Sequence, residues 1–384
     1  MKKLIVALLP LFFFQIIHAQ NPNCKLRVSL LTCSPGQELY STFGHSALRI
    51  IDSSTYRDVI YNYGTFDFDD PAFYSKFTRG KLLYFVSVDL FENFLKEYQY
   101  EQRGITEQVL DLSCTEKQKL ATALNENAKE ENKYYKYDFT IDNCTTRLRD
   151  IVFKNANETV IIHDIRPNKN ITFRDLIHEY LNKSHQYWSK FGIDVLLGMP
   201  LDKRLTNTEA MFLPDYLLKG FDSTTIGNKK LVAEKKEILK AQLQKNSDSL
   251  LSPLFVFSFL FLVVLLLSLI KKGDKLLSVF DFILFFSSGI LGILLLFMWL
   301  GTDHPQCKNN FNLAWAFPFH FIIVFFIYKN WNWLQYYFLI NSIGLALLLV
   351  SWKWLPQEIN NALIPVVGLL LLRSFVQYKN RHTQ

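Results

Sequence analysis

The stretch YDFTIDNCTTRLRD, residues 137–150, places Cys144 after a strand-like segment and at the expected start of a helix. The first turn of a helix presents free backbone N–H groups and the positive end of the helix dipole, which favour a thiolate over a thiol. We therefore expect Cys144 to be a nucleophile with a pKa lowered to roughly 3.5–7.5. The best candidate for its general base is His45, in STFGHSALRII (41–51).

An imidazole that acts as a base needs a third polar group to orient it. We choose Asn62, in the strand-like segment that follows His45, and Tyr63 and Asp142 are the alternatives. Asp142 and Asn143 are also placed to cap the helix that Cys144 begins. The two nearby arginines would contact a phosphate or a carboxylate of the substrate, or else form ordinary ion pairs. The candidates for substrate binding are Tyr63, Asn143, Arg147, Arg149 and His304.

Both ends of the chain carry membrane signals. Lys2 and Lys3 precede an apolar run that ends near the small residue Ala19, which is typical of a signal peptide over residues 1–19, with an uncleaved anchor as the alternative. Long apolar runs predict a five-helix membrane domain over residues 251–378, each run being near the ~20 residues that cross a bilayer. The expected spans are 252–270, 276–300, 312–328, 333–351 and 360–376, the last interrupted by Pro365 and Arg373.

Basic residues near the ends of these spans predict the orientation by the positive-inside rule. Residues 20–250 and the loops 301–311 and 352–359 are then outside the cytoplasmic membrane, in agreement with the signal peptide, and residues 379–384 form a cytoplasmic tail. The net charge of +7 is spread over the chain, and we expect no nucleic-acid partner. The basic residues concerned are Lys271, Lys272, Lys275, Lys329, Arg373, Lys379 and Arg381.

The exported part, residues 20–228, is expected to be an α+β catalytic domain. β-branched and aromatic residues predict strands at 26–33, 58–66 and 81–90, in addition to the strand that His45 begins. Helices are expected at 91–102 and 115–131, the second with Ser113 or Thr115 as its cap. Residues 229–250 mix Lys with Leu and Ile, which predicts a basic amphipathic linker on the headgroups or a solvated linker helix.

Cysteine and histidine positions leave two other readings open. A structural disulfide that includes Cys144 is the main alternative to its catalytic role, because export permits disulfides and the spacing selects no pairing. Asp303, His304 and Cys307 have metal-binding side chains, but no second cluster with zinc spacing accompanies them. We therefore expect no metal and no cofactor, and interpret His304 as an outer-loop residue near a headgroup or substrate. The remaining cysteines are Cys24, Cys33, Cys114 and Cys307.

These segments together resemble the Lnb-type lipoprotein N-acyltransferases, in which an exported domain precedes several membrane helices. More broadly, a strand histidine followed by Asn-Cys at a helix start is similar to permuted papain-like enzymes of the NlpC and lecithin:retinol acyltransferase types. The resemblance implies that His45 and Cys144 are base and nucleophile, that a membrane phospholipid donates the acyl chain, and that a diacylated apolipoprotein accepts it. The segments are LLTCSPGQELYSTFGHSALRI, YNYGTFDF, YDFTIDNCTTRLRD, FGIDVLLGMPLD, MFLP and TDHPQCKNNFN.

Two other functions fit the same residues. A membrane-tethered thiol hydrolase, either a cell-wall amidase or peptidase or a phospholipase, would use the same pair with water as acceptor. A non-catalytic receptor or assembly factor would use Cys144 structurally. In FGIDVLLGMPLD, Asp194 and Asp202 either line the cleft or belong to a helix end and a turn.

Overall fold

Strand β1 (Leu26–Cys33) is buried on both of its faces, because Val28 and Leu30 join one apolar cluster while Leu31 and Cys33 join another. It is the third strand of a seven-stranded sheet in which every neighbouring pair is antiparallel. The computed structural model describes residues 24–242, 251–270 and 274–382. In pairing order the strands are β10 (Val232–Leu239), β5 (Ile105–Leu110), β1, β2 (His45–Asp52), β3 (Arg57–Thr65), β4 (Leu83–Leu90) and β6 (Tyr134–Lys136).

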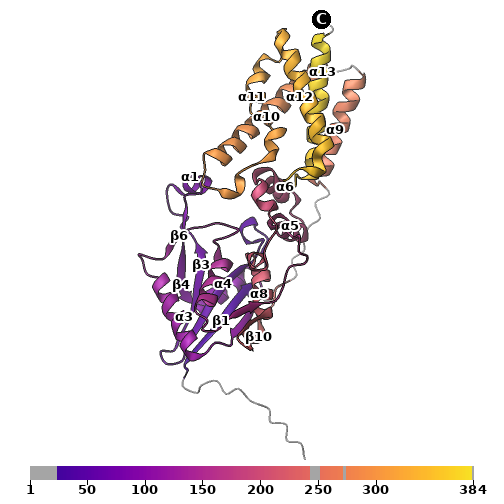
Figure 1. Ribbon diagram of the computed structural model, residues 1–384. Coiled ribbons are helices and arrows are strands. Elements are labelled where there is room, and N and C mark those ends of the chain that lie inside the picture. The colour runs from indigo at the N-terminus through magenta and orange to yellow at the C-terminus, as the bar shows by residue number, and fades with distance from the viewer. Residues whose placement is uncertain (1–23, 243–250, 271–273, 383–384) are drawn as a thin grey trace, which may run out of the picture.

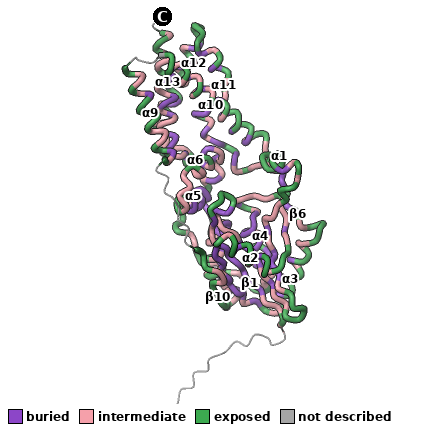
Figure 2. The backbone as a smooth tube through the Cα atoms, turned by 180° about the vertical axis from the view of Figure 1, so that it is seen from behind, coloured by how far each residue is buried: buried purple, intermediate pink, exposed green. Residues whose placement is uncertain are grey.

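Helices cover both faces of this sheet, and Figure 2 shows the buried residues concentrated between the layers. The helices α3 (Cys114–Asn127), α4 (Cys144–Lys154) and α8 (Pro214–Ser223) pack on one face, and α2 (Phe91–Tyr100) packs on the other. Ser113 caps α3 as expected, since its hydroxyl accepts from the backbone N–H of Glu116. The exported part is thus a mixed α/β domain, as predicted.

Smaller elements connect the sheet to the rest of the chain. Helix α1 precedes β4, and a three-stranded sheet of order β7-β8-β9 lies beyond α4. Helices α5 and α6 stand between the large sheet and the C-terminal helices (Figure 1). The bounds are α1 (Phe73–Thr78), β7 (Val160–Ile162), α5 (Phe173–Lys183), α6 (Tyr187–Leu196), α7 (Asn207–Ala210), β8 (Thr224–Ile226) and β9 (Lys229–Lys230), with 3-10 turns at Leu39–Ser41 and Met199–Asp202.

The expected linker helix at 229–250 is wrong, because residues 229–239 form β9 and β10 instead. β10 pairs with β5 and is an edge of the sheet, where Lys235 forms an ion pair with Asp222 and Lys236 with Glu107. Charged side chains suit an exposed edge strand because they hinder pairing with further chains. The remainder of that segment, 243–250, and the expected signal peptide, 1–19, lie outside the described residues.

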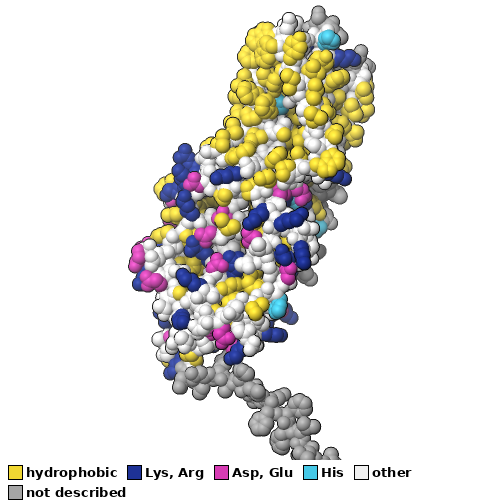
Figure 3. Space-filling view, viewed as in Figure 1, with side chains coloured by type: hydrophobic (Ala, Val, Ile, Leu, Met, Phe, Trp, Pro, Cys, Tyr) yellow, Lys and Arg dark blue, Asp and Glu magenta, His cyan; other side chains and the backbone are white. Residues whose placement is uncertain are grey.

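Four helices among the described residues are long and apolar enough to cross a membrane. Figure 3 shows hydrophobic side chains covering this part of the molecule, with charged ones below it. The third expected span, 312–328, is not one long helix but short turns that include α11 (His320–Ile323). Pro318 lacks a backbone N–H, and Asn312 is tied to the carbonyls of Asp194 and Val195. The long helices are α9 (Pro253–Ile270), α10 (Asp274–Leu300), α12 (Asn332–Ser351) and α13 (Ile364–His382).

Arg373, which interrupts the last span in the sequence, is accommodated by a buried partner. Its guanidinium donates to both carboxylate oxygens of Asp281 on α10, at 2.5 and 2.9 Å, and to the hydroxyl of Ser268 on α9. A charged side chain within a span is costly unless it is paired inside the bundle. The pair therefore links three helices of the membrane domain.

A second buried ion-pair network joins α5 to α6 and the membrane domain. Arg174 donates to Asp194 at 2.9 Å and to both oxygens of Asp202 at 2.9 and 3.0 Å. Asp194 also accepts from His178 at 2.7 Å and from Asn360, which lies just before α13, at 2.8 Å. These aspartates therefore connect the domains, and neither is among the described residues that line the cavity around Cys144.

Candidate active site

Cys144 is the first residue of α4, and its position is fixed by the cap that precedes it. The Asn143 side chain accepts from the backbone N–H of Thr146 at 2.9 Å and donates to the carbonyls of Phe139 and Phe212 at 2.7 and 2.8 Å. Asn143 is only 2% exposed. Its amide is therefore engaged in holding the start of α4. Asn143 also lines the cavity around Cys144, so its contact with substrate stays a prediction.

His45 and Asn62 meet at one end of the sheet. β2 and β3 are antiparallel with Leu48 opposite Tyr61, so both residues lie beyond that pair in the same direction. His45 Nε2 lies 2.5 Å from Asn62 Oδ1. An amide oxygen only accepts, so Nε2 carries the proton and Nδ1 is left as the basic nitrogen. The choice of Asn62 over Tyr63 and Asp142 as the orienting group thus agrees with the geometry.

Gly44 explains how the chain turns into β2 at His45. Its φ is +79°, and a Cβ there would lie 2.6 Å from the carbonyl oxygen of Cys33. A residue with a side chain would both strain the backbone and clash with β1. Glycine at this position therefore sets the direction in which His45 leaves the turn.

Burial controls the protonation of both groups. It lowers the pKa of His45 to about 4, against the effect of the hydrogen bond that His45 donates to Asn62 and together with the charge of Arg103. It raises the pKa of the Cys144 thiol to about 11, although the backbone N–H groups of Ser46 and Thr145 favour the thiolate. The expectation of a lowered cysteine pKa is therefore wrong, because removal from water outweighs the helix start. Both shifts favour a neutral thiol and a neutral imidazole in the resting site.

The three residues line one cavity of about 470 Å³. Its floor comes from the end of the sheet and the start of α4, and its sides include aromatic rings and polar groups from α2 and the turn after it. A cavity of this size is typical of small-molecule sites. Besides His45, Asn62 and Cys144, the lining includes Phe43, Tyr84, Tyr98, Arg103, Tyr137, Phe139 and Phe212.

Two family models match the chain. The model described as the Lnb N-terminal periplasmic domain matches residues 13–183, and the model described as the Lnb transmembrane domain matches residues 244–384. The chain belongs to the Lnb-type N-acyltransferase family. It is therefore a membrane protein with a periplasmic domain, and its family suggests a lipoprotein N-acyltransferase-like role. Comparison with curated proteins and with solved structures gives no match.

In this Lnb protein, three residues expected to bind substrate have other partners. Tyr63 is buried, and its hydroxyl accepts from Asn127 at 2.8 Å. Arg147 forms a bidentate pair with Asp142 at 2.6 and 2.9 Å. Arg149 bonds Asp150 and the carbonyl of Thr208. None of Tyr63, Arg147 and Arg149 is among the described residues that line the cavity around Cys144, so the two arginines are ion-pairing residues.

His304 lies in a different place from the other candidates. It belongs to the loop that follows α10, and its Nε2 donates to the carbonyl of Phe77, the residue before the end of α1, at 2.9 Å. It lines a second cavity at the junction of the two domains. The sequence therefore correctly placed His304 beside the membrane helices but did not reveal that it contacts α1.

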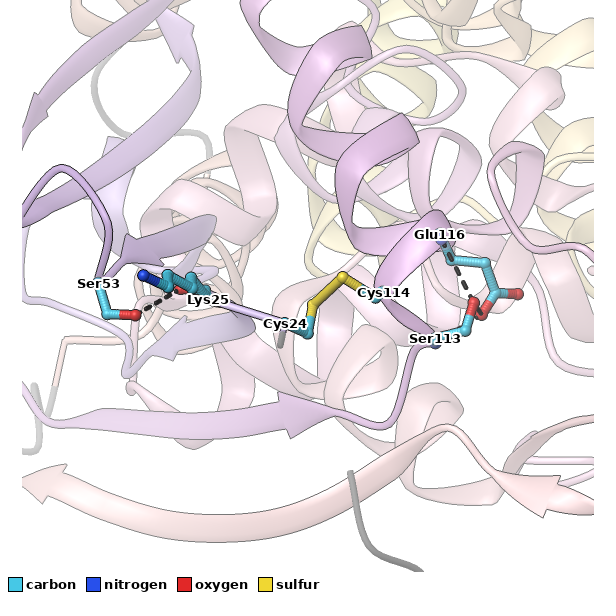
Figure 4. Close-up of a disulfide and its surroundings, with 6 residues drawn as sticks. All are labelled: Cys24, Lys25, Ser53, Ser113, Cys114 and Glu116. Atoms are coloured by element: carbon cyan, nitrogen blue, oxygen red, sulfur yellow. Dashed lines mark hydrogen bonds between the residues drawn. A yellow bond between two sulfur atoms is a disulfide. The ribbon is translucent and has the colours of Figure 1, made fainter. Parts of the chain in front are cut away.

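The cysteines of the Lnb protein divide into one disulfide and three free thiols among the described residues. Cys24 and Cys114 are paired, and Figure 4 shows this bond at the start of α3, beside the Ser113–Glu116 cap. Cys33, Cys144 and Cys307 are free and buried. Cys144 is thus available as a nucleophile, which removes the main alternative reading of this residue. Among the described residues there is also no group of three or more His, Cys, Asp and Glu that could hold a metal ion.

Several site residues had no signal in the sequence. The backbone N–H of Ser46 reaches Cys144, and the Arg103 guanidinium lies near His45. Arg103 is 6% exposed, donates to the carbonyl of Ser34 at 2.8 Å and stacks on Tyr98. Ser46 meets Cys144 because α4 packs on β2, and Arg103 comes from the turn after α2, so tertiary packing brings both groups to the site.

Proposed function

We propose that this Lnb protein is an apolipoprotein N-acyltransferase of the cytoplasmic membrane, which moves an acyl chain from a phospholipid to a lipoprotein through a thioester on Cys144. The observation that supports this most is the placement of Cys144, His45 and Asn62 in one cavity of a periplasmic domain attached to membrane helices. Both substrates are lipids of the outer leaflet, and this architecture holds a thiol beside them. The arrangement also fits the permuted papain-like fold that we expect for this domain.

In the first half-reaction, Nδ1 of His45 takes the thiol proton while Cys144 Sγ attacks the ester carbonyl carbon of the phospholipid. The tetrahedral intermediate collapses with cleavage of the ester C–O bond. The His45 imidazolium returns the proton to the departing oxygen, so a lysophospholipid leaves and a thioester remains. Backbone N–H groups in the first turn of α4 stabilise the oxyanion, and one such donor is typically worth about 3–4 kcal/mol.

In the second half-reaction, the α-amino group of the diacylglyceryl-modified N-terminal cysteine attacks the thioester carbonyl. A C–N bond forms and the C–S bond breaks, and His45 carries the amine proton to the departing Cys144 sulfur. The product is an N-acylated lipoprotein, and the enzyme returns to its neutral resting pair. A neutral resting pair suits this cycle, because the full cycle begins and ends with the proton on sulfur, and the imidazole is neutral again after each half-reaction.

The test compares the wild-type protein with Cys144→Ala in cells, by mass spectrometry of the N-terminal peptide of an abundant lipoprotein. Loss of one acyl chain from the terminal amine in the variant is the expected result. Cys33→Ala is the matched control, because Cys33 is a buried free thiol that does not line the cavity, and it should keep the chain. An unchanged peptide, with altered lysophospholipid or cell-wall fragments, would instead identify a hydrolase.

A further inference from the structure

A second cavity, also of about 470 Å³, lies between the periplasmic domain and the membrane domain. Its walls are mainly apolar and come from α5, α6 and the strand ends of the large sheet. The loop 303–307, which includes His304 and Cys307, also lines it, together with Phe77 of α1 and Gly80 in the turn after α1. We call it the junction cavity. Among its lining residues, Phe43, Tyr84, Tyr137 and Phe139 also line the cavity around Cys144.

These four aromatic residues form a common wall between the two cavities. Tyr84 and Tyr137 stack with ring centroids 4.4 Å apart, and Phe43 meets Phe139 edge-to-face at 5.0 Å. A Cβ built on Gly64 would lie 3.7 Å from both Cys144 Cβ and the Tyr137 ring. The wall is therefore adjacent to the nucleophile on one side and to the junction cavity on the other.

The far side of the junction cavity is at the outer end of a membrane span. The loop that lines it begins three residues after Leu300, where α10 ends. The backbone N–H of Asp303 donates to the carbonyl of Arg79 at 2.9 Å, which fixes α1 to this loop. On α1, Tyr74 and Phe77 are 81% and 50% exposed, as aromatic side chains at a membrane–water interface commonly are. Figure 1 shows α1 beside the end of the membrane helices that faces the periplasmic domain.

The charged residues that line the junction cavity are already paired, which argues against a charged occupant. Lys136 forms an ion pair with Asp303 at 3.2 Å. Asp138 accepts from Gln306 Nε2 at 2.6 Å, and the same amide donates to Thr140 at 2.9 Å. A headgroup would have to break these bonds, whereas a hydrocarbon chain would gain from the apolar walls without disturbing them.

We propose that the junction cavity binds one acyl chain of the phospholipid donor and retains that chain in the Cys144 thioester, so that its size selects the chain length transferred. This inference rests on the proposed function. The chain enters from the outer leaflet beside α1, passes the aromatic wall and presents its ester carbonyl to Cys144. The headgroup, which is joined to that ester through glycerol, then lies on the Cys144 side of the aromatic wall, and the lysophospholipid leaves from that side.

The test changes Ile193, a half-buried residue of α6 that lines the junction cavity but not the cavity around Cys144. Purified full-length protein in detergent is mixed with dioctanoyl or dipalmitoyl phospholipid, and thioester formation is followed by intact-protein mass spectrometry. Ile193→Trp should lower the ratio of long-chain to short-chain rates by about tenfold, the effect of excluding roughly two methylene groups. Ile193→Ala should raise the ratio.

Leu83→Trp is the matched control, because Leu83 is 48% exposed on β4 and lines neither cavity. Its ratio should equal that of the wild type. If both Ile193 variants form the thioester with an unchanged ratio, the junction cavity does not hold the chain, although the proposed function stands. If the wild type forms no thioester with either lipid, the proposed function fails, and this inference fails with it.

Discussion

The protonation state of the resting site can be tested directly, because the structure gives the two pKa values that decide it. The Cys144 thiol has a pKa of about 11 and the His45 imidazole a pKa of about 4. Both shifts disfavour the charged forms, so burial favours the state in which the proton stays on sulfur and the imidazole is neutral. We therefore expect the neutral pair, and not a pre-formed thiolate–imidazolium pair, to predominate before substrate binds.

This prediction fixes how Cys144 should react with a small alkylating agent. At pH 7 a thiol with a pKa of about 11 is thiolate in about one molecule in ten thousand, against about 3% for an unperturbed cysteine. Alkylation of Cys144 by iodoacetamide should therefore be slow at pH 7 and should rise about tenfold per pH unit up to pH ~10. Peptide-resolved mass spectrometry follows Cys144 separately from the buried thiols Cys33 and Cys307.

His45→Gln supplies the decisive comparison. If the resting pair is neutral, the imidazole does not stabilise a thiolate, and the pH profile of alkylation should be the same in the variant and the wild type. Thioester formation should nevertheless be lost in the variant, because the base is missing. A plateau of alkylation between pH 6 and 8 in the wild type that disappears in His45→Gln would show a pre-formed ion pair and refute the argument from burial.

Three further predictions follow from single contacts. Asn62→Ala removes the acceptor of the His45 Nε2–H and should slow single-turnover thioester formation by about 10–100-fold, since a buried donor left unsatisfied costs about 1–3 kcal/mol. A rate within twofold of the wild type would contradict the role of Asn62 in orienting His45. Replacing Cys24 and Cys114 together by Ala removes a disulfide with a sequence separation of 90 and should lower the free energy of unfolding by up to about 4–5 kcal/mol. The melting temperature should fall, while thioester formation should be retained at low temperature. Arg174→Met leaves two buried carboxylates without their cation and should lower the free energy of unfolding by about 3–5 kcal/mol. The expected result is faster proteolysis between the two domains. Unchanged proteolysis would show that this ion-pair network does not hold the domains together.

Local signals in the sequence were enough to place Cys144 at a helix start and to predict the cap before it. An amide followed by a cysteine before helix-forming residues predicts an N-cap at Asn143 and a helix that begins at Cys144, because capping depends on neighbours within one turn. The long apolar runs likewise placed four spans to within a few residues at their starts. The sequence also predicted that His45 and Asn62 lie on neighbouring strands, since both segments show β-branched and aromatic patterning.

Contacts between distant segments decided the rest. The amphipathic composition of 229–239 is compatible with a helix, but pairing with β5 makes the segment a strand. The apolar run at 312–328 has the length of a span, but Asn312 is bound to the carbonyls of α6. Arg147 has the chemistry of a phosphate ligand, but Asp142 occupies its guanidinium. In each case the competing partner lies in a contact that periodicity does not encode.

The sequence by itself determined which residues can do the chemistry, because residue type, capping and hydrophobic length are local properties. Only the tertiary structure decided their charge state and surroundings. Cys144 has a raised pKa because α4 and the sheet remove it from water, an effect that outweighs the helix start visible in the sequence. The aromatic wall between the catalytic and junction cavities likewise exists only because residues 43, 84, 137 and 139 come together through folding.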